Sequence, residues 1–175
     1  HGLTVTAPGA TGDGLSLAEH VGGSVTDKNH RSGAFWMPTS IYNTSGDSSV
    51  HSEGATLFPH IVLDRAKPGL IAVNSRGERF VNEAGSYHDF VSAMFDMPAQ
   101  GPRAPVWLVC DAKFVWRYGL GIVRPWQVSL RHFVKARYLT RGNTLEQLAQ
   151  KLGVDPQALV ATVVRHNKFA RTGVD

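Results

Sequence analysis

The chain has 175 residues, 42% hydrophobic and 18% charged, which suits one folded domain with an apolar core. Its net charge of +4 comes without any run of Lys or Arg, which argues against a nucleic-acid partner. No apolar stretch approaches the roughly 20 residues that span a bilayer. The single cysteine, Cys110, excludes an internal disulfide framework and indicates a reducing compartment, so we expect a cytoplasmic protein. Its apolar neighbours at 106–109 are typical of a buried structural thiol.

A glycine-rich loop at 8–14 precedes the first predicted helix. Residues 15–21 have helical spacing, and Gly22 and Gly23 would end the helix. Glycine permits close backbone approach, and the free N–H groups at a helix start suit an anion or a set of sugar hydroxyls. The same pattern is common in plain N-caps and turns, and it completes neither a P-loop nor a dinucleotide fingerprint. On its own, the loop leaves both interpretations open.

The middle of the chain alternates loops with short apolar segments. Residues 26–60 are polar and rich in Gly and Ser, with Phe35 and Trp36 in a small apolar island, and we expect an irregular loop there. Beyond it, the pattern predicts a strand over 61–63, a hairpin of 70–74 with 79–82, a helix over 88–94, a buried strand over 105–111, a helical turn over 112–118 and a loop over 119–125.

Two amphipathic helices are predicted near the end of the chain. Residues 144–147 form a capping-box pattern before the first of them, which Gly153 ends. Asp155 is an N-cap, followed by proline at the first helical position, and this second helix runs to about Ala170. Strands interrupted by helices, without strict alternation, indicate an α+β fold, with a small mixed sheet and flanking helices.

Titratable residues form no complete metal or hydrolase motif. The eight histidines lack His-x-x-x-His spacing and the chain has no Cys-x-x-Cys pair, so we expect no metal site. Ser-His-Asp chemistry stays open, although no Gly-x-Ser-x-Gly elbow is present. Tyr87 closely follows Asn82 and Glu83, and a tyrosine there can give or take a proton. Without further context, an ordinary half-buried aromatic is the simpler interpretation of Tyr87.

Three motifs in order resemble one family. They are ATGDG at 10–14, GERFVNE at 77–83, and NTLEQLA at 143–149, the last followed by Gly-Val-Asp at 153–155 and His-Asn at 166–167. Together they resemble, over nearly the whole chain, the FAD-dependent flavoproteins that include fumarate reductases, succinate dehydrogenases and 3-ketosteroid dehydrogenases. In that family a substrate-capping domain interrupts the FAD-binding fold. The resemblance implies that residues 1–25 are the edge of the FAD-binding domain and residues 26–175 the capping domain of a longer flavoprotein.

The resemblance also assigns roles to particular residues. FAD is the cofactor that it implies for the full-length protein, and the residues that would meet it are Thr11, Gly12 and Asp13. We expect the chain alone to bind little or no FAD, because most of the flavin site lies elsewhere in the family's sequence. The residues expected to bind substrate or shape its site are Phe35, Trp36, Asn82 and Glu83. Tyr87 is the expected catalytic residue, which transfers a proton.

Position 87 distinguishes the branches of this family. Fumarate reductases carry an arginine there and an upstream Thr-Glu pair that residues 61–65 lack, whereas ketosteroid dehydrogenases carry a tyrosine. The resemblance therefore implies dehydrogenation or reduction of a C–C bond next to a carbonyl, with hydride transfer to flavin N5 and a small-molecule substrate such as an apolar ketone or steroid. A fumarate or succinate type of dicarboxylate chemistry is the alternative. A non-catalytic ligand-binding or interaction module is a second alternative, from another class.

Overall fold

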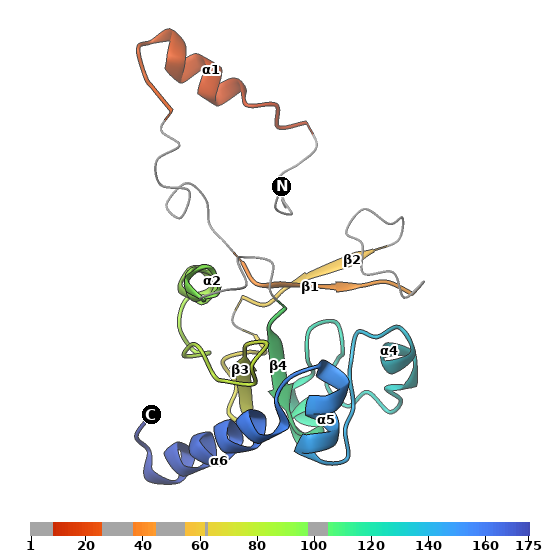
Figure 1. Cartoon of the computed structure of the whole chain (residues 1–175). Coiled ribbons are helices and arrows are strands. Elements are labelled where there is room, and N and C mark those ends of the chain that lie inside the picture. Colours follow the sequence, from red (N-terminus) through yellow and green to blue (C-terminus); the bar gives the residue numbers. More distant parts are fainter. Residues whose placement is uncertain (1–8, 26–36, 45–54, 62, 98–104) are drawn as a thin grey trace. The chain divides into compact units, whose positions relative to one another are not determined.

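The computed structural model describes residues 9–25, 37–44, 55–61, 63–97 and 105–175 (Figure 1). The chain divides into two compact units, residues 1–35 and 36–175. The described part of the first unit holds one helix, α1 (Asp13–His20). Gly12 precedes it in the left-handed conformation, with φ of 91°, and no side chain caps the helix start. The loop and helix predicted for this segment are therefore confirmed, and every side chain of α1 is exposed within the described unit.

The centre of the second unit is a pair of antiparallel strands. They are β3 (Leu70–Val73) and β4 (Trp107–Cys110), with Leu70 opposite Cys110 and Val73 opposite Trp107. All four residues of β3 are buried, which explains why its sequence is a continuous apolar run. Helix α3 (Ala112–Tyr118) follows β4 directly, and the Asp111 carboxylate caps it by accepting the N–H of Phe114 at 2.7 Å.

Helices α5 (Leu145–Leu152) and α6 (Pro156–Thr172) pack against this strand pair (Figure 1). Their starts are as predicted: Thr144 accepts the N–H of Gln147 at 3.2 Å, and Asp155 accepts that of Gln157 at 2.8 Å. Gly153 ends α5 in the left-handed conformation. The buried cluster that joins the strands to the two helices consists of Ile71, Val73, Val109, Ala149, Val154 and Leu159.

The predicted hairpin of 70–74 with 79–82 is wrong as a strand pair. The turn exists, since the N–H of Asn74 donates to the carbonyl of Glu78 at 2.9 Å. The returning segment, however, makes only one isolated bridge, between Val73 and Arg79. Strand β3 instead pairs with β4, which is apolar and can share its buried surface. Among the described residues, both strand pairs are antiparallel, so the α+β class is confirmed but the sheet is not mixed.

A second strand pair lies where only a loop was expected. Strands β1 (Thr39–Tyr42) and β2 (Thr56–Pro59) pair antiparallel, with Ser40 opposite Phe58. The strand predicted over 61–63 is wrong, because β2 ends before His60 and Leu63 lies in a turn with 75% of its surface exposed. Ile61 and Leu63 are therefore not part of a buried sheet. The chain turns there because the Asp64 carboxylate and carbonyl accept N–H groups of the residues that follow.

Two further helices complete the described part. Helix α2 (Tyr87–Asp96) confirms the helix predicted over 88–94, and its N-cap, Ser86, accepts the N–H of Asp89 at 3.0 Å. The short helix α4 (Arg131–Lys135) was not predicted, and Phe133 is its buried residue. Within the described ranges, no helix has both the length and the apolar character needed to cross a membrane.

Candidate functional site

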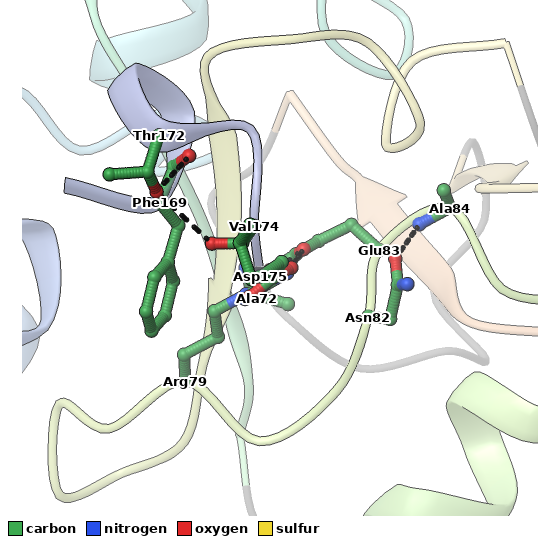
Figure 2. Close-up of polar contacts among 9 residues, drawn as sticks. All are labelled: Ala72, Arg79, Asn82, Glu83, Ala84, Phe169, Thr172, Val174 and Asp175. Carbon is green, nitrogen blue, oxygen red and sulfur yellow. Dashed lines mark hydrogen bonds and ion pairs between the residues drawn. The ribbon is translucent and has the colours of Figure 1, made fainter. Parts of the chain in front are cut away.

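The segment between β3 and α2 is organised by a buried ion pair (Figure 2). Arg79 donates to both carboxylate oxygens of Glu83, and the closest contact, from Nη2 to Oε2, is 2.7 Å. The guanidinium also binds the carboxylate of Asp175, with Nη2 to Oδ2 at 2.7 Å. The hydrogen bonds that Arg79 donates to Glu83 and Asp175 raise the pKa of Arg79 above its ordinary value, and the bond to Asp175 lowers the pKa of that carboxyl. The arginine of the GERFVNE motif is thus a fixed positive centre.

Glu83 joins this segment to the core. Its side chain is 7% exposed, and Oε1 also accepts the backbone N–H of Ala72, in the middle of β3, at 2.7 Å (Figure 2). Asn82 is exposed, and its side-chain oxygen accepts the N–H of Ala84 at 3.0 Å, which forms a local turn. The Glu83 carboxylate is therefore occupied by protein groups. Its role in the substrate site stays a prediction, and these contacts suit a residue that shapes the site.

Tyr87 begins helix α2, immediately after the turn that Asn82 makes and the Ser86 N-cap. Its side chain is half-buried. The structure places Asn82, Glu83 and Tyr87 on one short segment, as the sequence implies. Phe35 and Trp36, the other expected substrate residues, lie outside the described residues. The catalytic assignment of Tyr87 stays a prediction.

An open pocket of about 570 Å³ lies beside the same segment. Its walls come from the segment, from α6 and from the residues that follow α6. The lining residues are Arg79, Phe80, Val81, Asn82, Thr162, Arg165, His166, Phe169 and Asp175. Of the expected substrate residues, Asn82 alone is among them, and Tyr87 is not. We therefore do not identify this pocket with the expected substrate site.

A buried chain of polar side chains, which the sequence did not reveal, lies under the β1–β2 pair. His60 binds the Asp64 carboxylate through Nδ1 at 2.7 Å and the Ser40 hydroxyl through Nε2 at 2.8 Å. The Ser40 hydroxyl in turn lies 2.8 Å from the Tyr138 hydroxyl. Two backbone N–H groups of one loop join it, since Gly121 donates to Asp64 and Ile122 donates to Tyr138. We call Ser40, His60, Asp64 and Tyr138 the His60 chain.

Electrostatics sets the direction of hydrogen donation along the His60 chain. Burial alone would raise the pKa of Asp64, but the hydrogen bond and charge of His60 and two backbone N–H groups outweigh it and lower that pKa. An ionised Asp64 can only accept, so Nδ1 of His60 donates to it. A neutral His60 accepts at Nε2 from the Ser40 hydroxyl, which then accepts from Tyr138, whereas a charged His60 donates at Nε2 to Ser40. Both backbone N–H groups that reach the His60 chain, those of Gly121 and Ile122, already donate to its side chains. The His60 chain therefore offers no oxyanion hole for hydrolysis.

Replacing Asp64 with asparagine is expected to destabilise the fold by about 3 kcal/mol at pH 7, because His60 and the Gly121 N–H lose a charged acceptor. The folded pKa of Asp64 lies below its ordinary value of 3.8, so its contribution is present above about pH 4 and is lost as the pH falls through the folded pKa. Urea unfolding at pH 7 and pH 3 measures the difference. Asp89→Asn, at an exposed site, is the control. An equal loss at both pH values would contradict the assignment.

Cys110 and the acidic and histidine side chains suggest no further chemistry. Burial, with the charges of Asp111 and Asp64, raises the pKa of Cys110 to about 12, so its thiol is protonated at neutral pH. Among the residues that the structure describes, no three His, Cys, Asp or Glu side chains are grouped to hold a metal ion.

The loop before α1 has the chemistry that a phosphate or ribose group of FAD requires. With Gly12 as N-cap and no side-chain cap, N–H groups of the first turn are available to a ligand. A Cβ added at Gly9, Gly12 or Gly14 would meet no described atom within 4 Å, so the backbone is open to close approach. The Thr11 hydroxyl lies 2.9 Å from the Asp13 carboxylate. These residues fit FAD, and their contact with it stays a prediction.

An α+β unit with a GERFVNE segment, preceded in the sequence by a glycine loop open to an anion, is typical of a flavoprotein. The sequence model of one family, described as an FAD binding domain, matches residues 1–175, so the chain belongs to this family of FAD-binding domains. The predicted family and its cofactor, FAD, are thereby confirmed.

Its relatives include dehydrogenases of cyclic ketones. The chain is 38% identical, over 95% of its length, to 4-oxocyclohex-2-ene-1-carboxylate 5-dehydrogenase of Sinomonas cyclohexanicum. It is 33% identical, over 98% of its length, to 3-oxosteroid 1-dehydrogenase of Mycobacterium tuberculosis. Fumarate reductase (cytochrome) of Shewanella frigidimarina is more distant, at 24% identity over 99% of the chain. The chain spans 27%, 29% and 25% of these three proteins.

A solved structure agrees with this placement. The crystal structure of 3-ketosteroid Δ1-dehydrogenase from Sterolibacterium denitrificans, in complex with 1,4-androstadiene-3,17-dione, superposes with a TM-score of 0.71 at 28% identity. The match covers 97% of this chain and 28% of that one. The fold described above is therefore that of part of a ketosteroid dehydrogenase.

Proposed function

We propose that the full-length protein is an FAD-dependent dehydrogenase that oxidises a C–C bond next to the carbonyl of a six-membered cyclic ketone. The observation that carries the proposal is the position of Tyr87. It stands half-buried at the first position of α2, on a segment that Arg79 and Glu83 fix to the core. The names of the relatives support the substrate class, because a cyclohexenone ring and a 3-oxosteroid A-ring share the same ketone.

The reaction needs two hydrogens to leave neighbouring carbons. In our proposal the Tyr87 Oη, as a phenolate, takes the proton from the α-carbon, and the electron pair of that C–H bond becomes the new C=C bond. FAD, when bound, supplies the acceptor for the hydride that leaves the β-carbon. The product is the unsaturated ketone, and the proton then passes from Tyr87 to solvent. A tyrosine suits this step, because its phenolate can accept the α-proton while the apolar body of its ring packs well against a ketone ring.

We further propose that residues 26–175 are the substrate-capping domain and that Thr11, Gly12 and Asp13 hold part of FAD. The buried contacts of Glu83 support a positioning role for it, and the exposed Asn82 is free to face substrate on its outer side. Phe35 and Trp36 remain the proposed apolar wall. The single thiol, Cys110, supports a reducing compartment such as the cytoplasm.

The direct test is turnover by the full-length protein. We expect reduction of an artificial electron acceptor with 4-oxocyclohexanecarboxylate or with androst-4-ene-3,17-dione, and an unsaturated ketone by mass spectrometry. Succinate is the matched non-ketone substrate, and fumarate tests the reverse direction. Turnover of succinate or fumarate alone would replace our proposal with the dicarboxylate alternative. Bound FAD without turnover of any of the four would favour the non-catalytic module.

A further inference from the structure

Arg65 is the largest fully buried side chain in the described part of the molecule, with 0% of its surface exposed. Burial disfavours a positive charge and lowers the pKa of Arg65, while the nearby charges of Asp64 and Glu83 oppose that shift. Removing a guanidinium from water has a large free-energy cost, and an apolar side chain of similar volume is often better tolerated. A buried arginine therefore calls for a reason beyond packing.

Among the described residues, its guanidinium contacts backbone carbonyls and a ring, and donates to no carboxylate. Nε donates to the carbonyl of His60 at 2.9 Å, and Nη1 donates to the carbonyl of Glu83. The guanidinium carbon lies 5.3 Å from the centre of the Phe90 ring. The neighbouring carboxylates are already engaged, that of Asp64 by His60 and that of Glu83 by Arg79. Nη2 is buried and has no hydrogen-bond partner among the described residues, so the arginine is held in place by the directions of its Nε and Nη1 donors.

Two of these contacts lie on either side of Tyr87. Glu83 is in the turn that leads into α2, and Phe90 is buried in the first turn of the same helix. Residues three apart lie on neighbouring positions of a helix surface, so holding Phe90 also holds the helical turn from which the Tyr87 side chain projects. Building on the function proposed above, we infer that Arg65 is a positioning residue, whose guanidinium sets the Tyr87 phenol from both ends of its segment.

Hydrogen bonds of the backbone at Arg65 and of the neighbouring Asp64 make this support rigid. Its own N–H donates to the Asp64 carboxylate at 2.9 Å, and Asp64 is held by His60 and by the N–H of Gly121. The His60 chain therefore anchors the backbone from which Arg65 reaches the Tyr87 segment. Arginine is suited to this task because its planar group donates in several fixed directions at once, which a lysine ammonium does not.

The test compares Arg65→Met and Arg65→Lys in the full-length protein, with 4-oxocyclohexanecarboxylate and androst-4-ene-3,17-dione as substrates. A misplacement of about 1 Å lowers turnover by about 10²-fold, so we expect that loss in kcat for both variants, with KM within about threefold. Flavin content should be unchanged. Arg76→Met, at a turn position with 61% of the arginine side chain exposed, is the control. Wild-type kcat in Arg65→Lys would overturn the inference, because charge alone would then suffice.

A second measurement does not depend on turnover. In this experiment, 3-fluorotyrosine is incorporated at position 87 alone of the full-length protein. The ¹⁹F resonance of this label then reports the surroundings of the phenol. We expect Arg65→Met to shift or broaden this resonance, whereas a label at position 118 stays unchanged. If Arg65→Met does not fold, Phe90→Leu removes the ring contact and is expected to move the same resonance. An unmoved resonance in a folded variant overturns the inference. A moved resonance in a protein that oxidises no ketone supports it and refutes only the proposed function.

Discussion

Replacing Tyr87 with phenylalanine is expected to lower the kcat of the full-length protein by about 10² to 10⁴-fold, the usual contribution of a positioned proton-transfer group. The change removes one oxygen from a half-buried side chain at the start of α2. The backbone there is held by the Ser86 N-cap and by Glu83, so the fold and the bound flavin should persist. Steady-state kinetics with a cyclic ketone, together with the flavin spectrum, measure both expectations.

The matched control is Tyr118→Phe. Tyr118 is also half-buried and ends α3, where its ring packs edge-on against Phe114. Loss of its hydroxyl should leave kcat within about twofold, because no proton transfer is assigned to it. If Tyr87→Phe and Tyr118→Phe lose activity equally, or neither loses it, Tyr87 is not the proton-transfer residue. If a variant loses both kcat and bound flavin, the substitution has disturbed the structure and not only the proton transfer.

Replacing Gly119 with alanine is expected to destabilise the second unit by about 4 kcal/mol, the sum of backbone strain and overpacking. Gly119 ends α3 with φ of 74° and ψ of −178°, a conformation that suits glycine alone. An added Cβ would lie 2.3 Å from the carbonyl oxygen of Val123, which is backbone and cannot swing away. Urea unfolding followed by tryptophan fluorescence measures the loss.

Gly153→Ala separates strain from collision. Gly153 also ends a helix with positive φ, at 71°, but an added Cβ there meets no described atom within 4 Å. Its loss should be about 1 to 2 kcal/mol, the cost of the left-handed conformation alone. Equal losses at positions 119 and 153 would show that the loop at 119–123 relaxes around the new methyl group.

Helices α5 and α6 could be predicted because their signals are local. The capping hydroxyl of Thr144, the Asp155-Pro156 start and the glycines at 153 and 173 each act within one helical turn. The structure reproduces them almost residue for residue. Strand pairing carries no such local signal. From the sequence, strand β3 could pair with the near segment at 79–82 or with the distant β4. It pairs with β4, because that pairing buries more apolar surface.

The candidate site was predictable only where it follows a motif. Asn82, Glu83 and Tyr87 lie on six consecutive residues, so a family pattern reaches them together. The His60 chain gathers side chains from Ser40, from 60–64 and from Tyr138, and no spacing in the sequence links them. The four-residue spacing of His60 and Asp64 was a weak signal, because the described residues at 60, 61, 63 and 64 are not helical. Such networks appear only after the fold has brought their members together.

The hydroxyl pair of Ser40 and Tyr138 has a consequence for how the chain acquires its structure. The two residues are 98 positions apart, and Arg79 and Asp175 are 96 apart. Contacts between such distant residues form late, because the entropy of closing the intervening loop must first be overcome. During synthesis, β1 leaves the ribosome long before Tyr138 exists. The hairpin that carries Ser40 must therefore wait, with its polar groups in water, until the segment that carries Tyr138 has emerged.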